Sequence, residues 1–146
     1  MANTDYTVGG VPVSNLDTGK FVIMKRVMNA AAIIASDATL TTAAKITAAE
    51  VIQAIDVPAG FYVTGTGIYV TTAGTAGNTV NIGFGGHTDS FQNGANIVSL
   101  GKVATLLGDT YGSGWLFPSA DTIDVIYVAD EIIGQFTLAV TGYQMF

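Results

Sequence analysis

The residues best suited to catalysis lie close together, because His87, Asp89 and Ser90 follow the glycines of a GFGG stretch. A Ser–His–Asp hydrolase uses these residue types, but its serine needs a base that a third group orients separately. His87 is the only histidine in the chain, and its setting does not match the strand–turn–helix of a nucleophile elbow. We therefore predict an exposed loop histidine rather than a catalytic one.

The acidic residues also lack a catalytic arrangement. Asp121 and Asp124 are three residues apart, so on a strand they face opposite sides and cannot flank one bond. Asp130 and Glu131 are adjacent and predict a turn. A weak calcium site there or around Asp89 stays open as an alternative, although the chain has no EF-hand spacing. The sequence thus predicts no catalytic residue, no metal site and no cofactor, which indicates a protein that is not an enzyme.

Three aromatic residues could present flat rings to a sugar: Tyr111, Trp115 and Phe117. A carbohydrate-binding module uses such a platform. A single tryptophan in an apolar cluster is more often part of a core. Glycan binding is therefore kept as an alternative hypothesis.

The composition points to a protein that works through its surfaces. Only 11% of the 146 residues are charged and 49% are hydrophobic, whereas ordinary soluble domains carry about 25% charged residues. A chain with so few charges is expected to bury much of its outer surface against neighbours. We therefore expect an oligomer or a lattice subunit. The absence of cysteine leaves packing, backbone pairing and association as its sources of stability.

The net charge of −6 is unevenly distributed. Lys20, Lys25, Arg26 and Lys45 lie in the first third of the chain, and only Lys102 follows. Because a phosphate-binding surface needs clustered positive charge, nucleic-acid binding by most of the chain is disfavoured. The basic cluster near the start nominates that region for contact with another protein.

No stretch predicts a membrane helix. Residues 57–88 contain no charged side chain, but their many glycines and threonines break the roughly 20 apolar residues that a span requires. The first ten residues lack the basic and apolar regions of a secretory signal. We therefore expect no membrane contact and a protein made and used without translocation.

The early part of the chain alternates between strand and turn signals. Phe21 to Ala35 predicts one long strand or two short ones, in which Lys25 and Arg26 point to opposite faces, as in an edge strand or an arm. A short Ala-rich stretch from Thr41 to Ala49 predicts one or two helical turns. Val51 to Val57 then predicts a strand that ends at a Pro-Ala-Gly turn.

Two further strands are predicted to form a hairpin. Phe61 to Thr72 changes its alternation near Gly65 and Gly67, which predicts a β-bulge, and Thr79 to Phe84 alternates as a half-buried strand does. An ordered loop with Phe91 as an aromatic plug follows over Gly85 to Ala95.

The clearest pair of strands closes the chain on either side of the Asp130–Glu131 turn. The first alternates at Ile123, Val125 and Tyr127, and the second at Phe136, Leu138 and Val140.

About seven or eight short strands at this spacing predict an all-β fold, an antiparallel β-sandwich of jelly-roll-like architecture with an extended N-terminal arm. The expected organisation is a flexible segment over residues 1–18 and a single β-sandwich domain over residues 19–146.

The order of three motifs adds a resemblance. They are VPAGFYVTGTGIYVTTAG, TVNIGFGGHTDSFQNG and PSADTIDVIYVA, and the resemblance spans roughly residues 51–128, most of the chain. In this order they resemble the decoration, or cement, proteins of tailed-bacteriophage capsids. The resemblance implies a β-sandwich, often trimeric, bound to the outside of an icosahedral head at junctions between major capsid proteins. Such a protein is made in the host cytoplasm and ends on the capsid exterior.

On this reading the partners are the major capsid protein and further copies of the chain. We expect the basic residues Lys20, Lys25 and Arg26 to contact the capsid, with the acidic remainder toward solvent or trimer mates. The alternatives are another virion component, such as a head fibre base, a tail part or a spike domain, and the carbohydrate-binding module already named.

Overall fold

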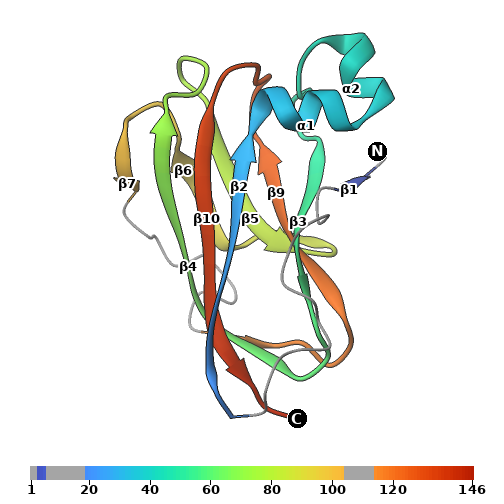
Figure 1. Cartoon of the computed structure of the whole chain (residues 1–146), viewed down its shortest axis with the longest axis vertical. Coiled ribbons are helices and arrows are strands. Elements are labelled where there is room, and N and C mark those ends of the chain that lie inside the picture. Colours follow the sequence, from blue (N-terminus) through green and yellow to red (C-terminus); the bar gives the residue numbers. More distant parts are fainter. Residues whose placement is uncertain (1–2, 6–18, 104–113) are drawn as a thin grey trace.

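The chain folds into two facing β-sheets, in a computed structural model that describes residues 3–5, 19–103 and 114–146 (Figure 1). Sheet A has the strand order β1-β3-β9-β5-β6, and sheet B has the order β2-β10-β4-β7 with β8 paired to β4. The strands of sheet A are β1 (Asn3–Asp5), β3 (Val51–Val57), β9 (Asp121–Tyr127), β5 (Thr79–Phe84) and β6 (His87–Asn96). Those of sheet B are β2 (Phe21–Asn29), β10 (Gln135–Gln144), β4 (Phe61–Thr72), β7 (Gly101–Val103) and β8 (Trp115–Leu116). The predicted all-β, antiparallel sandwich is confirmed.

The order of the strands is that of a jelly roll. Eight strands in chain order, β2 to β7 followed by β9 and β10, form the two four-stranded arrays β2-β10-β4-β7 and β3-β9-β5-β6. Apart from β5–β6, each successive pair of these strands lies in opposite sheets. This is the wrapping of two Greek keys that defines the architecture.

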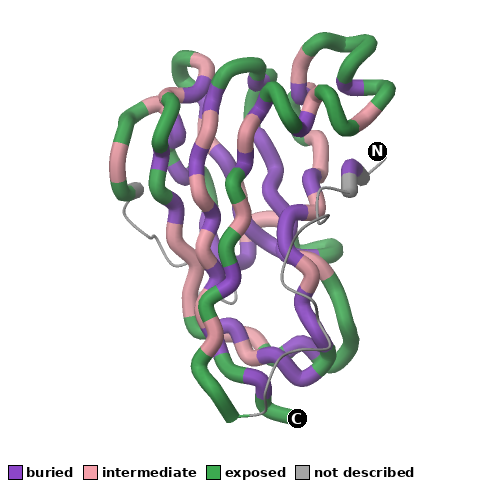
Figure 2. Tube along the Cα trace, viewed as in Figure 1, coloured by how far each residue is buried: buried purple, intermediate pink, exposed green. Residues whose placement is uncertain are grey.

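Buried side chains of both sheets meet in one hydrophobic core. Figure 2 shows how buried and more exposed positions alternate along the strands. Sheet B contributes Met24, Met28, Val70, Leu138 and Val140, and sheet A contributes Ile52, Val80, Ile82, Ile123 and Val125. Each of these side chains is at most 1% exposed. The alternation predicted for both closing strands is therefore confirmed, because each strand turns its apolar residues inward.

A register shift between Thr141 and Gly142 places an extra residue, Thr64, in β4 opposite β10. This irregularity moves the buried positions of β4 from Phe61 and Val63 to Ile68 and Val70. The predicted bulge near Gly65 is confirmed.

Two predictions of strand pairing were wrong. The strands β4 and β5 do not form a hairpin, since β4 pairs with β10 and β5 pairs with β9 and β6. The closing strands β9 and β10 likewise lie in different sheets. In both cases a short connection crosses from one sheet to the other, as jelly-roll wrapping requires, rather than folding back within one sheet.

Two predictions of local structure also need correction. The stretch over Gly85 to Ala95 is not a loop, because most of it forms β6, antiparallel to β5. Phe91 is buried there as expected. The extended backbone expected over Phe21 to Ala35 ends at Asn29, where helix α1 (Ala30–Ser36) begins.

Side-chain caps explain why helices replace strand in the β2–β3 connection. The Asn29 side chain accepts a hydrogen bond from the Ala32 amide, and Asp37 caps helix α2 (Ala38–Ala43) in the same way. Helix α2 ends where Ala44 takes a left-handed φ of 56°. The helix predicted over Thr41 to Ala49 is thus present but begins and ends earlier. Within the described part of the chain, no helix has the length and apolar character needed to cross a membrane.

The start of the chain takes part in sheet A. Strand β1 pairs in parallel with β3, with Asn3 opposite Val51. It falls inside the segment of residues 1–18 that the sequence predicts to be flexible, and the rest of that segment lies outside the described residues. The boundary of the domain at residue 19 stays a prediction.

Candidate functional site

The two sheets carry charges of opposite sign. The strands of sheet B hold three charged residues, Lys25, Arg26 and Lys102, all of them basic. The strands of sheet A hold only acidic ones, namely Asp5, Asp56, Asp89, Asp121 and Asp124. The fold therefore converts a chain of net charge −6 into a sandwich with one basic side. We call the solvent-facing side of sheet B the outer face.

The outer face also exposes large apolar side chains. In β2, Phe21, Ile23 and Val27 are 52%, 51% and 48% exposed, and Tyr69 of β4 is 57% exposed. The Phe21 ring packs edge-on against Tyr143 of β10, with ring centroids 5.4 Å apart. Several large apolar side chains on one face of a sheet are unusual on a surface that meets only water.

A groove crosses the centre of the outer face. In one row of the sheet, Ala139 of β10 lies between Lys25 and Gly67. In the next row, Thr137 pairs with Tyr69, which pairs in turn with Lys102 of β7. Because alanine and glycine project little or nothing above the sheet, the first row is hollow. The resulting groove has a volume of about 410 Å³ and is lined by both lysines.

The predicted capsid-contact residues differ in their exposure to solvent. Lys20 and Lys25 are exposed, whereas Arg26 is half-buried, as expected for adjacent residues on opposite sides of a strand. Strand β2 lies at one edge of sheet B, as predicted. Lys102 was missed, because it is distant from the basic cluster in sequence and only the β4–β7 pairing brings it to the groove. Lys45 lies elsewhere, in an ion pair with Asp130.

The aromatic residues considered for glycan binding do not form one exposed platform among the described residues. Phe117 is 1% exposed, and Trp115 stacks on Phe84 with ring centroids 5.2 Å apart. Tyr111 lies outside the described residues. Phe117 therefore belongs to the core, and glycan binding through the remaining two stays a prediction.

The residues considered for hydrolysis are close in space but differently engaged. The Ser90 hydroxyl donates to the backbone carbonyl of His87, 2.9 Å away, instead of to its imidazole ring. The His87 ring lies beside Phe84, with centroids 5.3 Å apart. His87 is exposed, as predicted, although it begins strand β6 instead of lying in a loop.

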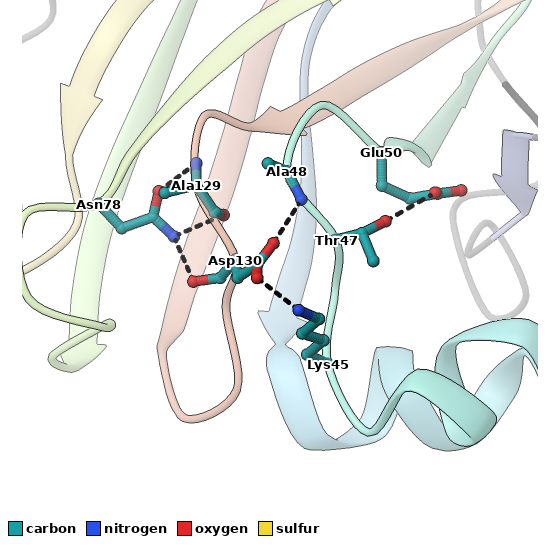
Figure 3. Close-up of polar contacts among 7 residues, drawn as sticks. All are labelled: Lys45, Thr47, Ala48, Glu50, Asn78, Ala129 and Asp130. Carbon is teal, nitrogen blue, oxygen red and sulfur yellow. Dashed lines mark hydrogen bonds and ion pairs between the residues drawn. The ribbon is translucent and has the colours of Figure 1, made fainter.

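The Asp130 carboxylate is used within the fold (Figure 3). It accepts hydrogen bonds from Lys45 Nζ at 2.6 Å and from the Ala48 amide at 2.8 Å. The hydrogen bond from Lys45 is the main reason that the pKa of Asp130 is lowered. These contacts tie the segment before β3 to the turn after β9.

The neighbouring Glu131 is completely buried and serves as an acceptor for several donors. Its carboxylate accepts hydrogen bonds from the backbone amides of Ile132, Ile133 and Gly134 at 3.0 to 3.1 Å. It also receives the Thr75 hydroxyl and the Asn78 amide. Burial opposes ionisation, but these donors outweigh it and lower the pKa of Glu131. In the described residues no group of three or more potential ligands could hold a metal ion.

At Asp124, burial affects the pKa more strongly than the hydrogen bonds do. Asp124 is 2% exposed, and burial is the main cause that raises its pKa from 3.8 to about 6. The Thr122 hydroxyl, 2.6 Å away, offsets this only in part. Asp121 is exposed where Asp124 is buried, which fits the opposite orientations expected on a strand.

Comparison with known proteins identifies the fold. No protein-family model matches the chain, and a search of curated proteins found no match. The fold is shared with chains of phage capsid structures. One is a chain of the cyanophage Pam1 capsid asymmetric unit, with a TM-score of 0.56 and 16% identity over 86% of both chains. Another is from the acidic stable capsid structure of Helicobacter pylori bacteriophage KHP30, with a TM-score of 0.59 and 12% identity over 89% of this chain and 92% of that one.

Proposed function

We propose that this chain is a non-enzymatic structural protein of a phage virion, and specifically a decoration or cement protein. It binds the outside of the head at junctions between capsomers and stabilises the shell through subunit contacts. The observation that carries the proposal is the outer face of sheet B, which combines exposed apolar side chains with charges of one sign. The shared fold with chains of phage capsid structures supports it.

Such a face suits adhesion to another protein. Burial of apolar surface contributes roughly 25 cal/mol per Å² before the costs of association are subtracted. Lys25 and Lys102 add attraction to an acidic surface and speed the encounter with it. No chemical step is needed for this role.

The proposal names two partners, the major capsid protein and further copies of the chain. A trimer accounts for the low content of charged residues, 11%, because subunit contacts would cover apolar surface outside sheet B. Light scattering on the purified 15.0 kDa chain is expected to give three times that mass. A monomer at all concentrations would contradict the trimer.

Reconstitution tests the proposed function. The purified chain is added to shells that lack it, taken from the virus that encodes it, and the washed shells are imaged. Saturable density on the outer surface at capsomer junctions is expected, together with greater resistance of the shells to heat. Density confined to a tail, a fibre or a vertex spike would instead support another virion component, and no bound density at all would refute both.

A further inference from the structure

We infer that the groove on the outer face binds a short acidic segment of the shell protein that inserts one apolar side chain between Lys25 and Lys102. This inference rests on the proposed function and adds the chemistry of the partner. It concerns one occupant, defined by an apolar residue with carboxylates on both sides.

The floor of the groove calls for an apolar side chain. It consists of the Ala139 methyl group and the backbone at Gly67 and Ile68, beside the Tyr69 ring. A polar side chain placed there would find few partners, whereas an aliphatic one would cover apolar surface that otherwise faces water. The volume of about 410 Å³ is ample for a leucine-sized group.

The rim of the groove is basic, so it favours negative charge beside the inserted apolar side chain. Lys25 lines it from β2 and Lys102 from β7, at the two margins of the β2-β10-β4-β7 path. The strands of sheet B contain no acidic residue that could neutralise either lysine. Carboxylates on both sides of the inserted residue would meet one lysine each, and a basic segment would be repelled.

Peptide titration tests the inference without any knowledge of the shell. Amide resonances of the labelled chain are followed by NMR as capped pentapeptides are added: DELED, the glycine control DEGED and the charge control KKLKK. DELED is expected to shift the resonances of Gly67, Tyr69 and Ala139 and to bind at least threefold more tightly than DEGED. Equal binding of KKLKK, shifts elsewhere in the molecule, or no shift at millimolar peptide would overturn the inference.

Two variants separate the contributions of charge and shape. K25Q combined with K102Q is expected to weaken DELED binding at least fivefold, and 0.5 M NaCl is expected to weaken it similarly. Ala139→Leu fills the groove without altering charge, so DELED should then bind no better than DEGED. Both variants change only the solvent side of sheet B, and an unchanged amide spectrum away from the groove verifies the fold. Unaltered DELED binding in both would contradict the inference.

A dilution series without peptide distinguishes the shell segment from a second copy of the chain. If the groove resonances depend on protein concentration, the occupant is another copy and the inference is wrong. The shell reconstitution described above is independent of these results. Shells that remain decorated while DELED fails to bind would leave the proposed function in place with a different contact, whereas bare shells with DELED bound would refute the proposed function and leave only the groove's preference for an acidic segment with an apolar residue.

Discussion

Asp124 is the buried carboxyl group whose ionisation the fold opposes. Its pKa of about 6 lies above the ordinary 3.8, mainly because of burial. Between these two values the folded chain holds a proton that the unfolded chain has released. The free energy of unfolding therefore falls as the pH rises through this window and is level above it. At 1.36 kcal/mol per pKa unit, the total fall is about 3 kcal/mol at most.

Asp124→Asn is expected to remove this cost. An asparagine carbonyl can still accept the backbone hydrogen bond from Gly85 that the carboxylate accepts. We expect the free energy of unfolding to rise by about 1 to 3 kcal/mol at pH 8 and to change little at pH 4. Urea unfolding at both pH values measures this, and an equal loss of stability at both would contradict the assignment.

At Glu131, in contrast, several hydrogen-bond donors stabilise the buried carboxylate and lower its pKa. Glu131→Gln keeps one oxygen for the amides of Ile132 and Gly134, but its NH₂ group would replace the oxygen that now accepts from the Asn78 side-chain amide, and the negative charge that these donors stabilise is lost. A loss of about 2 to 4 kcal/mol in the free energy of unfolding is expected at pH 7. Thermal and urea unfolding measure it.

Lys45→Ala is the matched control for that variant. It removes an ion pair in the same region whose side chains are 42% and 48% exposed, so a loss below about 1 kcal/mol is expected. If the two variants cost the same, Glu131 is not the organising group of this turn.

At the scale of elements, the sequence predicted the strands better than their partners. Alternation at Ile123, Val125 and Tyr127 reports burial on one face, and the structure confirms it. Alternation says nothing about which strand lies alongside, so a hairpin between neighbours in sequence is the default prediction. In a jelly roll that choice fails at most connections, because the chain crosses between the sheets.

The helix after β2 was missed for a different reason. Residues 21–35 are apolar apart from Lys25, Arg26 and Asn29, a composition that fits strand and helix alike, and the deciding signal is the cap at Asn29. The loop expected over Gly85 to Ala95 was mistaken because glycine and polar residues suggest turns. The structure places most of these residues in β6, where Asn81 of β5 accepts a hydrogen bond from the Gly94 amide.

The close approach of β5 and β6 gives a prediction about glycine. A Cβ atom at Gly83 would collide with the backbone at His87 and Thr88. Gly83→Ala is therefore expected to lower the free energy of unfolding by about 2 to 4 kcal/mol. Gly86→Ala, three residues on, meets open space and is expected to stay within about 1 kcal/mol of the parent. Equal midpoints in urea would show that β5 and β6 are not packed in this way.

At the scale of the whole molecule, the candidate site was predicted in part. The clustering of basic residues in the sequence predicts Lys20 and Lys25 as contact residues, and both are exposed at or next to β2. Lys102 and Tyr69 could not be added from sequence, since their nearness to Lys25 depends on the register of four strands. The separation of charge between the sheets is likewise a property of the topology, because acidic and basic strands are mixed along the chain.

Occupancy of the shell by charge-reversed chains tests the central claim most directly. K25E combined with K102E lowers the net charge by four on the outer face, and S119E combined with A120E lowers it by two at exposed positions outside the strands of sheet B. A K25E single variant matches that control in charge. We expect the control to decorate shells like the parent, K25E to bind more weakly, and K25E with K102E to lose most of its occupancy in sedimentation and imaging. Undiminished occupancy of the double reversal would show that sheet B is not the surface that holds this chain to the capsid.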